Sequence, residues 1–350
     1  MDRTRTVVGG VDTHAATHCA AVVDANGALL GTAEFTATPV GYRQLLAWLR
    51  SHGQIVKVGV EGTGSYGAGL ARVLAGGGVV VVEVPRPDRR VRAMRGKSDP
   101  IDAEAAARAA LSGSATAAAK GGDGAIEAIR QLRLARSGAV KAKTAALNSL
   151  RALLVTAPEQ LRVELAGLSR QRLLNRCAGF RPNPDRPADP TEAAKTAMRS
   201  VARRVIHLHD EALALHRQLA DLITSSAPTT AGLFALGPDT TAALLVAVGD
   251  NPDRLRSEAA FARLCGVAPI PASSGKTSRH RLHRGGNRTA NRALHAAVIV
   301  RLRYCPRTQD YMRRRRADGL SKLDAIRCLK RFLAREVFTA ISADFEALMT

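Results

Sequence analysis

The chain has 350 residues, enough for two or three domains that each bury a core of their own. It carries 52 Lys and Arg against 30 Asp and Glu, a formal net charge of +22, which favours a polyanion as its partner. With one Trp and 3% aromatic residues, a membrane-surface protein is disfavoured. No stretch resembles a membrane span or a signal peptide. The five cysteines are scattered without a CxxC pair, which is typical of a reduced cytoplasmic protein and argues against a zinc site.

Residues 1–120 predict an α/β domain. Residues 6–12 have the pattern of a strand, and residues 19–37 that of a hairpin around Asn26-Gly27, a strong turn signal. Helices and buried strands then alternate: helix 39–53, strand 56–62, helix 65–78, strand 79–85, a basic loop over 86–97 and a helix that opens near Asp99. This order predicts a three-stranded meander that parallel strands extend.

Residues 121–226 predict a helical segment without strands. Two long amphipathic helices, 124–155 and 191–223, flank a proline-rich break at 181–190. Small residues near heptad spacing favour a coiled-coil hairpin, which would act as a spacer or as a dimerisation arm. A plain helical subdomain explains the same pattern.

Residues 227–350 predict a third, mostly helical domain that is strongly basic. Between Lys276 and Arg335 lie 18 basic residues and three acidic ones, a bias expected of a phosphate-binding segment. Its start, with a Gly-Pro turn at 237–238, resembles a helix–hairpin–helix, although such a turn is often only a turn. The predicted phosphate-binding residues are Lys276, Arg279, Arg281, Arg284, Arg288 and Arg292.

Four carboxylates of the first domain are predicted to meet at one edge of the sheet. Asp12 ends the first strand, Glu61 ends the fourth, and Asp99 and Asp102 open the helix after the fifth strand. Asp99 could instead be the N-cap, with Pro100 at the first helical position and Asp102 at N3. Since four carboxylates among many basic residues suit a hard cation, the set predicts a Mg²⁺ site for phosphodiester chemistry, with Mn²⁺ as a substitute.

In this order, the motifs GVDTH, VEGTGSYG and KSDPIDA resemble the RNase H-like, Holliday-junction-resolvase-like domain of the Piv/MooV (IS one-ten) insertion-sequence transposases. The segment LCGVAPIPASSGKTSR…GGNRTANRAL is similar to their C-terminal transposase domain. The resemblance places the family's acidic set on Asp12, Glu61, Asp99 and Asp102. It places the nucleophilic serine on Ser274, with Ser273 as the rival. Relatives often carry Lys in place of His14 and Ala in place of Gly62, neither of which is a predicted ligand.

The resemblance implies an enzyme that cuts and rejoins donor and target DNA through a covalent phosphoserine. The acidic and serine domains would form one composite site, and an element-encoded, structured guide RNA serves at least one branch of the family. The predicted state is a homo-oligomer, a dimer or tetramer. The predicted location is the bacterial cytoplasm, at the nucleoid when the enzyme acts, without membrane attachment.

Three other functions fit parts of the sequence. A water-using Holliday-junction resolvase or nuclease needs the four acids but neither the serine nor the basic domain. An actin-like or sugar-kinase ATPase would share GVDTH, but it needs a second glycine-rich phosphate loop that neither GGGVVVV nor RGGNRTA supplies. A non-catalytic nucleic-acid-binding descendant would have no need of all four acids. Taken without its domain context, PASSGK is also explained by a polar turn.

Overall fold

The computed structural model describes residues 5–84, 98–115, 117–119, 122, 124–250, 256–273, 280–281, 283 and 285–349. The chain divides into two compact units. Unit 1 comprises Met1–Glu127 and Val248–Phe261, and unit 2 comprises Ala128–Ala247 and Ala262–Thr350.

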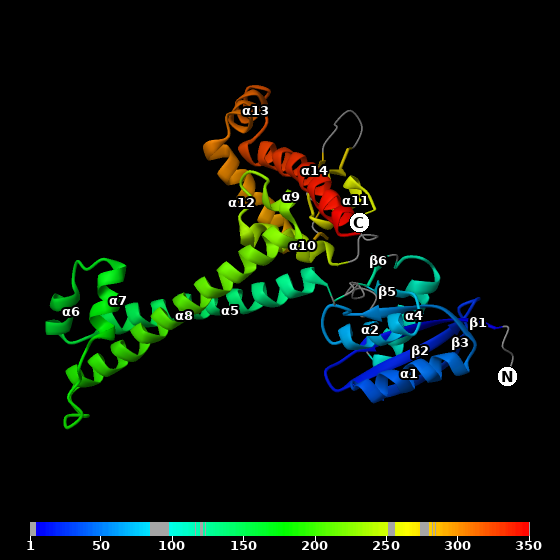
Figure 1. Cartoon of the computed structure of the whole chain (residues 1–350), viewed down its shortest axis with the longest axis horizontal. Helices are drawn as coiled ribbons and strands as arrows, with labels where there is room; N and C mark the ends of the chain where they lie inside the picture. Colours follow the sequence, from blue (N-terminus) through cyan, green and yellow to red (C-terminus); the bar gives the residue numbers. More distant parts are fainter. Residues whose placement is uncertain are drawn as a thin grey trace. The chain divides into compact units, whose positions relative to one another are not determined.

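Unit 1 is built on a six-stranded sheet with the order β3-β2-β1-β4-β5-β6 (Figure 1). Its strands are β1 (Thr6–Thr13), β2 (Thr17–Asp24), β3 (Leu29–Thr36), β4 (Gln54–Glu61), β5 (Val81–Val84) and β6 (Ala117–Ala118). The first three strands pair antiparallel, whereas β4 runs parallel to β1 and β5 parallel to β4. At the β2–β3 turn Gly27 has φ +83°, a conformation that glycine adopts without strain. The predicted meander with its parallel extension is confirmed.

Helices cover both faces of this sheet. They are α1 (Pro39–Ser51), α2 (Ala68–Gly76) and α4 (Asp99–Leu111). On one face Leu45 and Leu49 of α1 and Leu70 of α2 are fully buried and pack with strand residues such as Val11 and Val60. On the other face the alanines of α4 pack with the alternate strand residues, among them Val8 and Val23.

Two glycines allow α4 to approach the sheet closely. A Cβ at Gly10 of β1 would clash with the backbone of Ala103 and Ala107, and one at Gly59 of β4 would lie 2.6 Å from the carbonyl oxygen of Ala106. Because side chains alternate along a strand, residues two positions after these glycines face α4 as well. Those residues are Asp12 and Glu61.

Unit 2 contains a long helical hairpin. Its elements are α5 (Ala125–Thr156, whose first residues belong to unit 1), α6 (Glu159–Leu165), α7 (Arg170–Ala178) and α8 (Pro190–Ser226). The predicted long helices are confirmed as α5 and α8, which lie side by side (Figure 1) and share an apolar cluster that includes Leu150, Met198 and Val205. The short helices α6 and α7 were not predicted from the sequence. A coiled-coil packing of α5 against α8 stays a prediction.

The remainder of unit 2 is mainly helical. It contains α9 (Pro228–Ala231), α10 (Pro238–Val248, whose last residue belongs to unit 1), the end of α11 (Glu258–Leu264, of which Glu258–Phe261 belongs to unit 1), a ribbon of β7 (Ile270–Pro271) and β8 (His280–Arg281), α12 (Arg288–Tyr304), α13 (Pro306–Ala317) and α14 (Lys322–Met349). The buried carboxylate of Asp344 on α14 accepts bonds from the backbone of Thr229 and Thr230 and so ties α14 to α9. Among the helices described, none is long and apolar enough to cross a membrane.

Candidate functional site

Asp12 and Glu61 end two neighbouring parallel strands at the same edge of the sheet. Val11 pairs with Val60, and the two carboxylates follow directly. The Thr13 hydroxyl donates to the carbonyl oxygen of Glu61 over 2.8 Å, which links the two strand ends. Asp12 is 6% exposed and Glu61 8% exposed, so both acids are withdrawn from bulk water.

The start of α4 contributes Asp99 and Asp102. The helix begins at Asp99, and its N-cap is Ser98, which has extended backbone angles. The prediction that Asp99 could be the N-cap is therefore wrong by one residue, and Asp102 lies one position beyond N3. Asp102 is 6% exposed, while the Asp99 side chain is 46% exposed. A role at the helix start explains an exposed Asp99, but it does not require the burial of Asp102.

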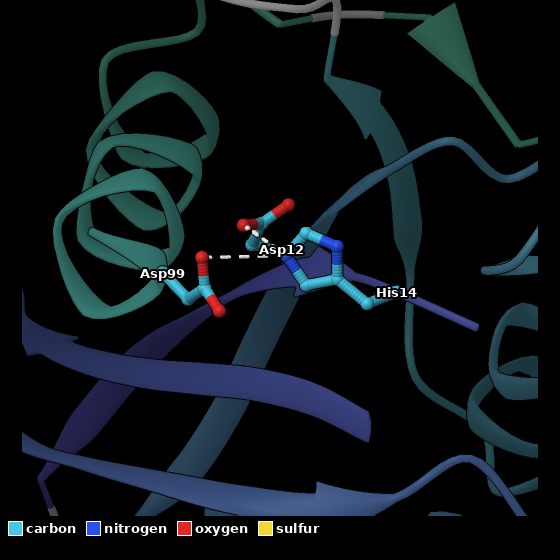
Figure 2. A group of neighbouring side chains, drawn as sticks. All are labelled: Asp12, His14 and Asp99. Carbon is cyan, nitrogen blue, oxygen red and sulfur yellow. Dashed lines mark hydrogen bonds and ion pairs between the residues drawn. The ribbon is translucent and has the colours of Figure 1, made fainter. Parts of the chain in front are cut away.

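Asp12, Asp99 and His14 form one compact group (Figure 2). His14 Nε2 lies 3.2 Å from Asp12 Oδ2 and 3.4 Å from Asp99 Oδ1. One ligand atom from each of the three residues falls within 4.8 Å of the others, close enough to share a metal ion. Figure 2 shows the imidazole turned toward both carboxylates, one on β1 and one at the start of α4.

The electrostatics of Asp12 favour a bound cation. Burial raises the pKa of its carboxyl, His14 lowers it, and the nearby carboxylates of Asp102 and Asp99 raise it further. An ionised Asp12 is thus costly in this environment, and a divalent ion would offset both the desolvation and the like-charge repulsion. Carboxylate oxygens with one imidazole nitrogen suit Mn²⁺, and the carboxylates suit Mg²⁺, so the residues fit a divalent metal.

The structure brings the four predicted acids to one region of unit 1. Asp12 and Glu61 share the strand edge, Asp99 shares the compact group, and Asp102 is near enough to raise the pKa of Asp12. His14 is the member that sequence reasoning did not select. The signal was present as Asp-x-His in GVDTH, because a strand end can turn both side chains toward one point.

The predicted nucleophile and half of the predicted phosphate-binding residues lie outside the described residues: Ser274, Lys276, Arg279 and Arg284. The other three, Arg281 on β8 and Arg288 and Arg292 on α12, are exposed. The Asn287 side chain caps α12 by accepting from the backbone of Thr289 and Ala290, so Arg288 occupies the first helical position. Three exposed guanidinium groups are thereby held on a β-ribbon and on one helix end.

Two comparisons with known proteins cover these regions. A family described as "Transposase", of the DEDD type of IS110, matches residues 9–158. The "Transposase IS116/IS110/IS902 family" matches residues 232–313. The chain is also 33% identical over 136 residues to the "Insertion element IS110 uncharacterized 43.6 kDa protein" of Streptomyces coelicolor. That match covers 38% of this chain and 33% of the relative's length. The first family match contains all four acids, and the second contains Ser274 and the six predicted phosphate-binding residues.

Proposed function

Because the chain belongs to the IS116/IS110/IS902 family of transposases, we propose that it cuts DNA strands and rejoins them to new partners. Asp12, Glu61, Asp99 and Asp102 hold the divalent metal, Mg²⁺ by preference and Mn²⁺ as a substitute. The observation that carries the proposal is the grouping of Asp12, Asp99 and His14 on the face of the sheet that α4 covers. The meander with parallel strands beside it supports an RNase H-like class for this sheet.

The nucleophile in this proposal is the hydroxyl of Ser274. Its oxygen forms a bond to phosphorus while the bond from phosphorus to one deoxyribose oxygen breaks, and the hydroxyl proton ends on that leaving oxygen. A hydroxyl of the incoming strand end then attacks the same phosphorus and releases the serine. A divalent ion bound by the acids supplies charge stabilisation for the attacking and leaving oxygens. Since each step exchanges one phosphoester for another, rejoining needs no ATP.

The chain's own residues prepare the acidic part of the site. The glycines at positions 10 and 59 let the start of α4 lie over the strand ends, so the acids of α4 and those of β1 and β4 share one side of the sheet. Asp12 and Asp102 are buried, so little bulk water reaches their carboxylates, and a divalent cation would stabilise their negative charge.

The proposal extends to partners and organisation. DNA is the substrate, as donor and as target, and a structured RNA encoded by the element is the proposed guide. The proposed domains are residues 1–120, 121–226 and 227–350. The helices of the middle domain are the proposed dimerisation arm, so the proposed state is a dimer or a tetramer. We place the protein in the cytoplasm, at the nucleoid when it acts.

Removal of single charges from the acids tests the proposal. We expect Asp12→Asn, Glu61→Gln, Asp99→Asn and Asp102→Asn each to abolish strand cleavage and to leave DNA binding unchanged, since amides keep the shape but lose the charge that a hard cation requires. Cleavage is followed on denaturing gels with labelled DNA, Mg²⁺ and any RNA that copurifies. Glu104→Gln is the matched control, because Glu104 lies on the same helix and pairs with Arg108.

Two results of this experiment contradict the proposal. If Asp102→Asn retains full Mg²⁺-dependent cleavage, Asp99 and Asp102 do not bind the metal and only stabilise the start of the helix. Loss of activity in Glu104→Gln to the same degree would mean that the acids of α4 act through stability of the helix and not through metal binding.

A further inference from the structure

Unit 2 contains a cavity of about 880 Å³ that the proposed function does not use. It lies between the segment before β7, β8, the end of α13 and the first turns of α14. Its lining includes an apolar part, with Val267, Pro269 and Leu320. The lining also includes five cationic side chains, Arg281, Arg315, Arg327, Lys330 and Arg331, and two carboxylates, Asp318 and Asp324.

The two carboxylates already have cationic partners. Asp318 pairs with Arg315 at 3.0 Å, and Asp324 pairs with Arg327 at 2.6 Å and accepts from the Ser321 hydroxyl. Each of these pairs is local, between residues three positions apart. The lining therefore keeps a surplus of positive charge around Lys330.

Lys330 is a buried cation with a neutral partner. Only 7% of the residue is exposed, and its Nζ donates to Asn291 Oδ1 over 3.0 Å. The amide of Asn291 is fixed, because its Nδ2 donates to the carbonyl oxygens of Cys265 and Gly266 at 3.0 Å each. Within the described part of the chain no carboxylate forms an ion pair with Lys330. Burial and the neighbouring Arg327 both lower the pKa of its ammonium group.

Burying an ammonium group beside other cations is unfavourable unless an anion enters. The cavity has the size of a site for a small organic molecule or a single nucleotide, and its wall combines several N–H donors with apolar surface. Multiple guanidinium and ammonium donors whose own carboxylates are already paired suit an oxyanion such as a phosphate. Arg281 of β8 lines the cavity and is also one of the residues predicted to bind phosphates.

We propose that this cavity binds a backbone phosphate of a DNA strand, with Lys330 Nζ and the Arg327 guanidinium as donors and the deoxyribose against Pro269 and Leu320. The choice of DNA rests on the proposed function, whereas the phosphate chemistry rests on the cavity alone. A DNA strand held here is anchored by residues of unit 2.

Alkylation of Cys328 reports occupancy of the cavity directly. Cys328 lines the cavity and is partly exposed, while Cys305 is equally partly exposed but lines a different cavity. We expect a DNA oligonucleotide to slow the reaction of N-ethylmaleimide with Cys328 at least about fivefold and to change the rate at Cys305 less than about twofold. Peptide mass spectrometry of the full-length protein measures both rates in one sample. EDTA prevents cleavage during the measurement.

Charge variants provide the second measurement. We expect Arg327→Gln and Lys330→Gln each to weaken DNA binding and to lower the slope of log K against log salt by about one, as the loss of one phosphate contact requires. Lys322→Gln is the matched control, because Lys322 is exposed on the same helix and does not line the cavity. If Lys330→Gln fails to fold, Arg327→Gln still tests the phosphate contact. The Arg327 side chain is 48% exposed, so we expect its replacement to leave the fold intact.

Three outcomes overturn the inference. If DNA binds but the rate of Cys328 alkylation does not change, the DNA binds outside this cavity. Protection by an RNA oligonucleotide of the same sequence, without protection by DNA, would assign the cavity to RNA. If the slope of log K against log salt is the same for wild type, Arg327→Gln and Lys322→Gln, Arg327 does not contact a phosphate. The proposed function is tested separately. If DNA slows the alkylation of Cys328 but the protein never cleaves DNA, the proposed function is contradicted and the phosphate site is not.

Discussion

His14 Nε2, just beyond the end of β1, lies 3.4 Å from Asp99 Oδ1 at the first residue of α4. The same nitrogen lies 3.2 Å from Asp12 Oδ2. One imidazole thus joins the strand end to the helix start within a set that otherwise consists of carboxylates. As a ligand, or as a hydrogen-bond donor to the two carboxylates, it would orient them toward one point.

We expect replacement of the His14 imidazole to weaken metal binding. We expect His14→Ala to lower the affinity for Mn²⁺ by about tenfold, the loss typical of a residue that binds or orients metal ligands. Isothermal titration calorimetry of the full chain without DNA measures this affinity. Because the His14 side chain is 46% exposed, the unfolding temperature should not change. His295→Ala, at an exposed histidine of α12, is the control, and equal affinities for the two variants would exclude a role for His14.

The close approach of α4 to β1 gives a stability prediction. Gly10→Ala places a methyl group against the backbone of Ala103 and Ala107, so the helix must move or the strand must distort. We expect unit 1 to lose about 1–3 kcal/mol, as overpacked cores do. We also expect cleavage to fall further than stability alone explains, because α4 carries two of the acids.

Urea unfolding followed by circular dichroism measures the effect. The matched control is Gly138→Ala within α5, where an added Cβ meets no atom within 4 Å. This change should stabilise its helix by up to about 1 kcal/mol. A Gly10→Ala protein as stable and as active as wild type would show that α4 does not need this glycine to reach the strand.

The basic segment predicts a uniform loss of affinity. Arg281→Ala, Arg288→Ala and Arg292→Ala should each weaken binding to all DNA sequences alike and lower the salt slope by about one, because phosphates carry no sequence information. Fluorescence anisotropy at several salt concentrations measures the slope. Arg50→Ala, at the end of α1 where Arg50 donates to the carbonyl of Gly77, is the control. A change in sequence preference with an unchanged slope would indicate base contacts instead.

Local sequence signals predicted the elements well, and the site only in part. Asn26-Gly27 specifies its turn through glycine's conformational freedom, so the hairpin could be predicted from two residues. The N-cap of α4 could not be predicted from the sequence, because Ser98 and Asp99 are both good capping residues. The extended backbone angles of Ser98 identify it as the N-cap.

The contact of His14 with Asp99 depends on tertiary packing, whereas its contact with Asp12 is local, within the Asp-x-His pattern. Its contact with Asp99 exists because Gly10 and Gly59 let α4 lie against the sheet, and the sequence shows the glycines without showing what approaches them. The convergence of Asp12 and Glu61 could be predicted, since parallel strands place their ends at one edge. Ser274 lies outside the described residues, so its proposed role rests on the sequence motif alone.

The proposed covalent role of Ser274 is what would distinguish a strand-joining enzyme from a water-using nuclease. Labelled DNA is incubated with the protein, Mg²⁺ and any copurifying RNA, and then resolved by denaturing electrophoresis before and after protease treatment. We predict a slow band that protease removes, its complete loss in Ser274→Ala, and its retention in Ser273→Ala, which keeps the hydroxyl of Ser274. A band that persists in Ser274→Ala and disappears in Ser273→Ala would move the nucleophile by one residue. Wild-type protein that cleaves DNA but never yields the band would contradict the serine mechanism and establish hydrolysis by water.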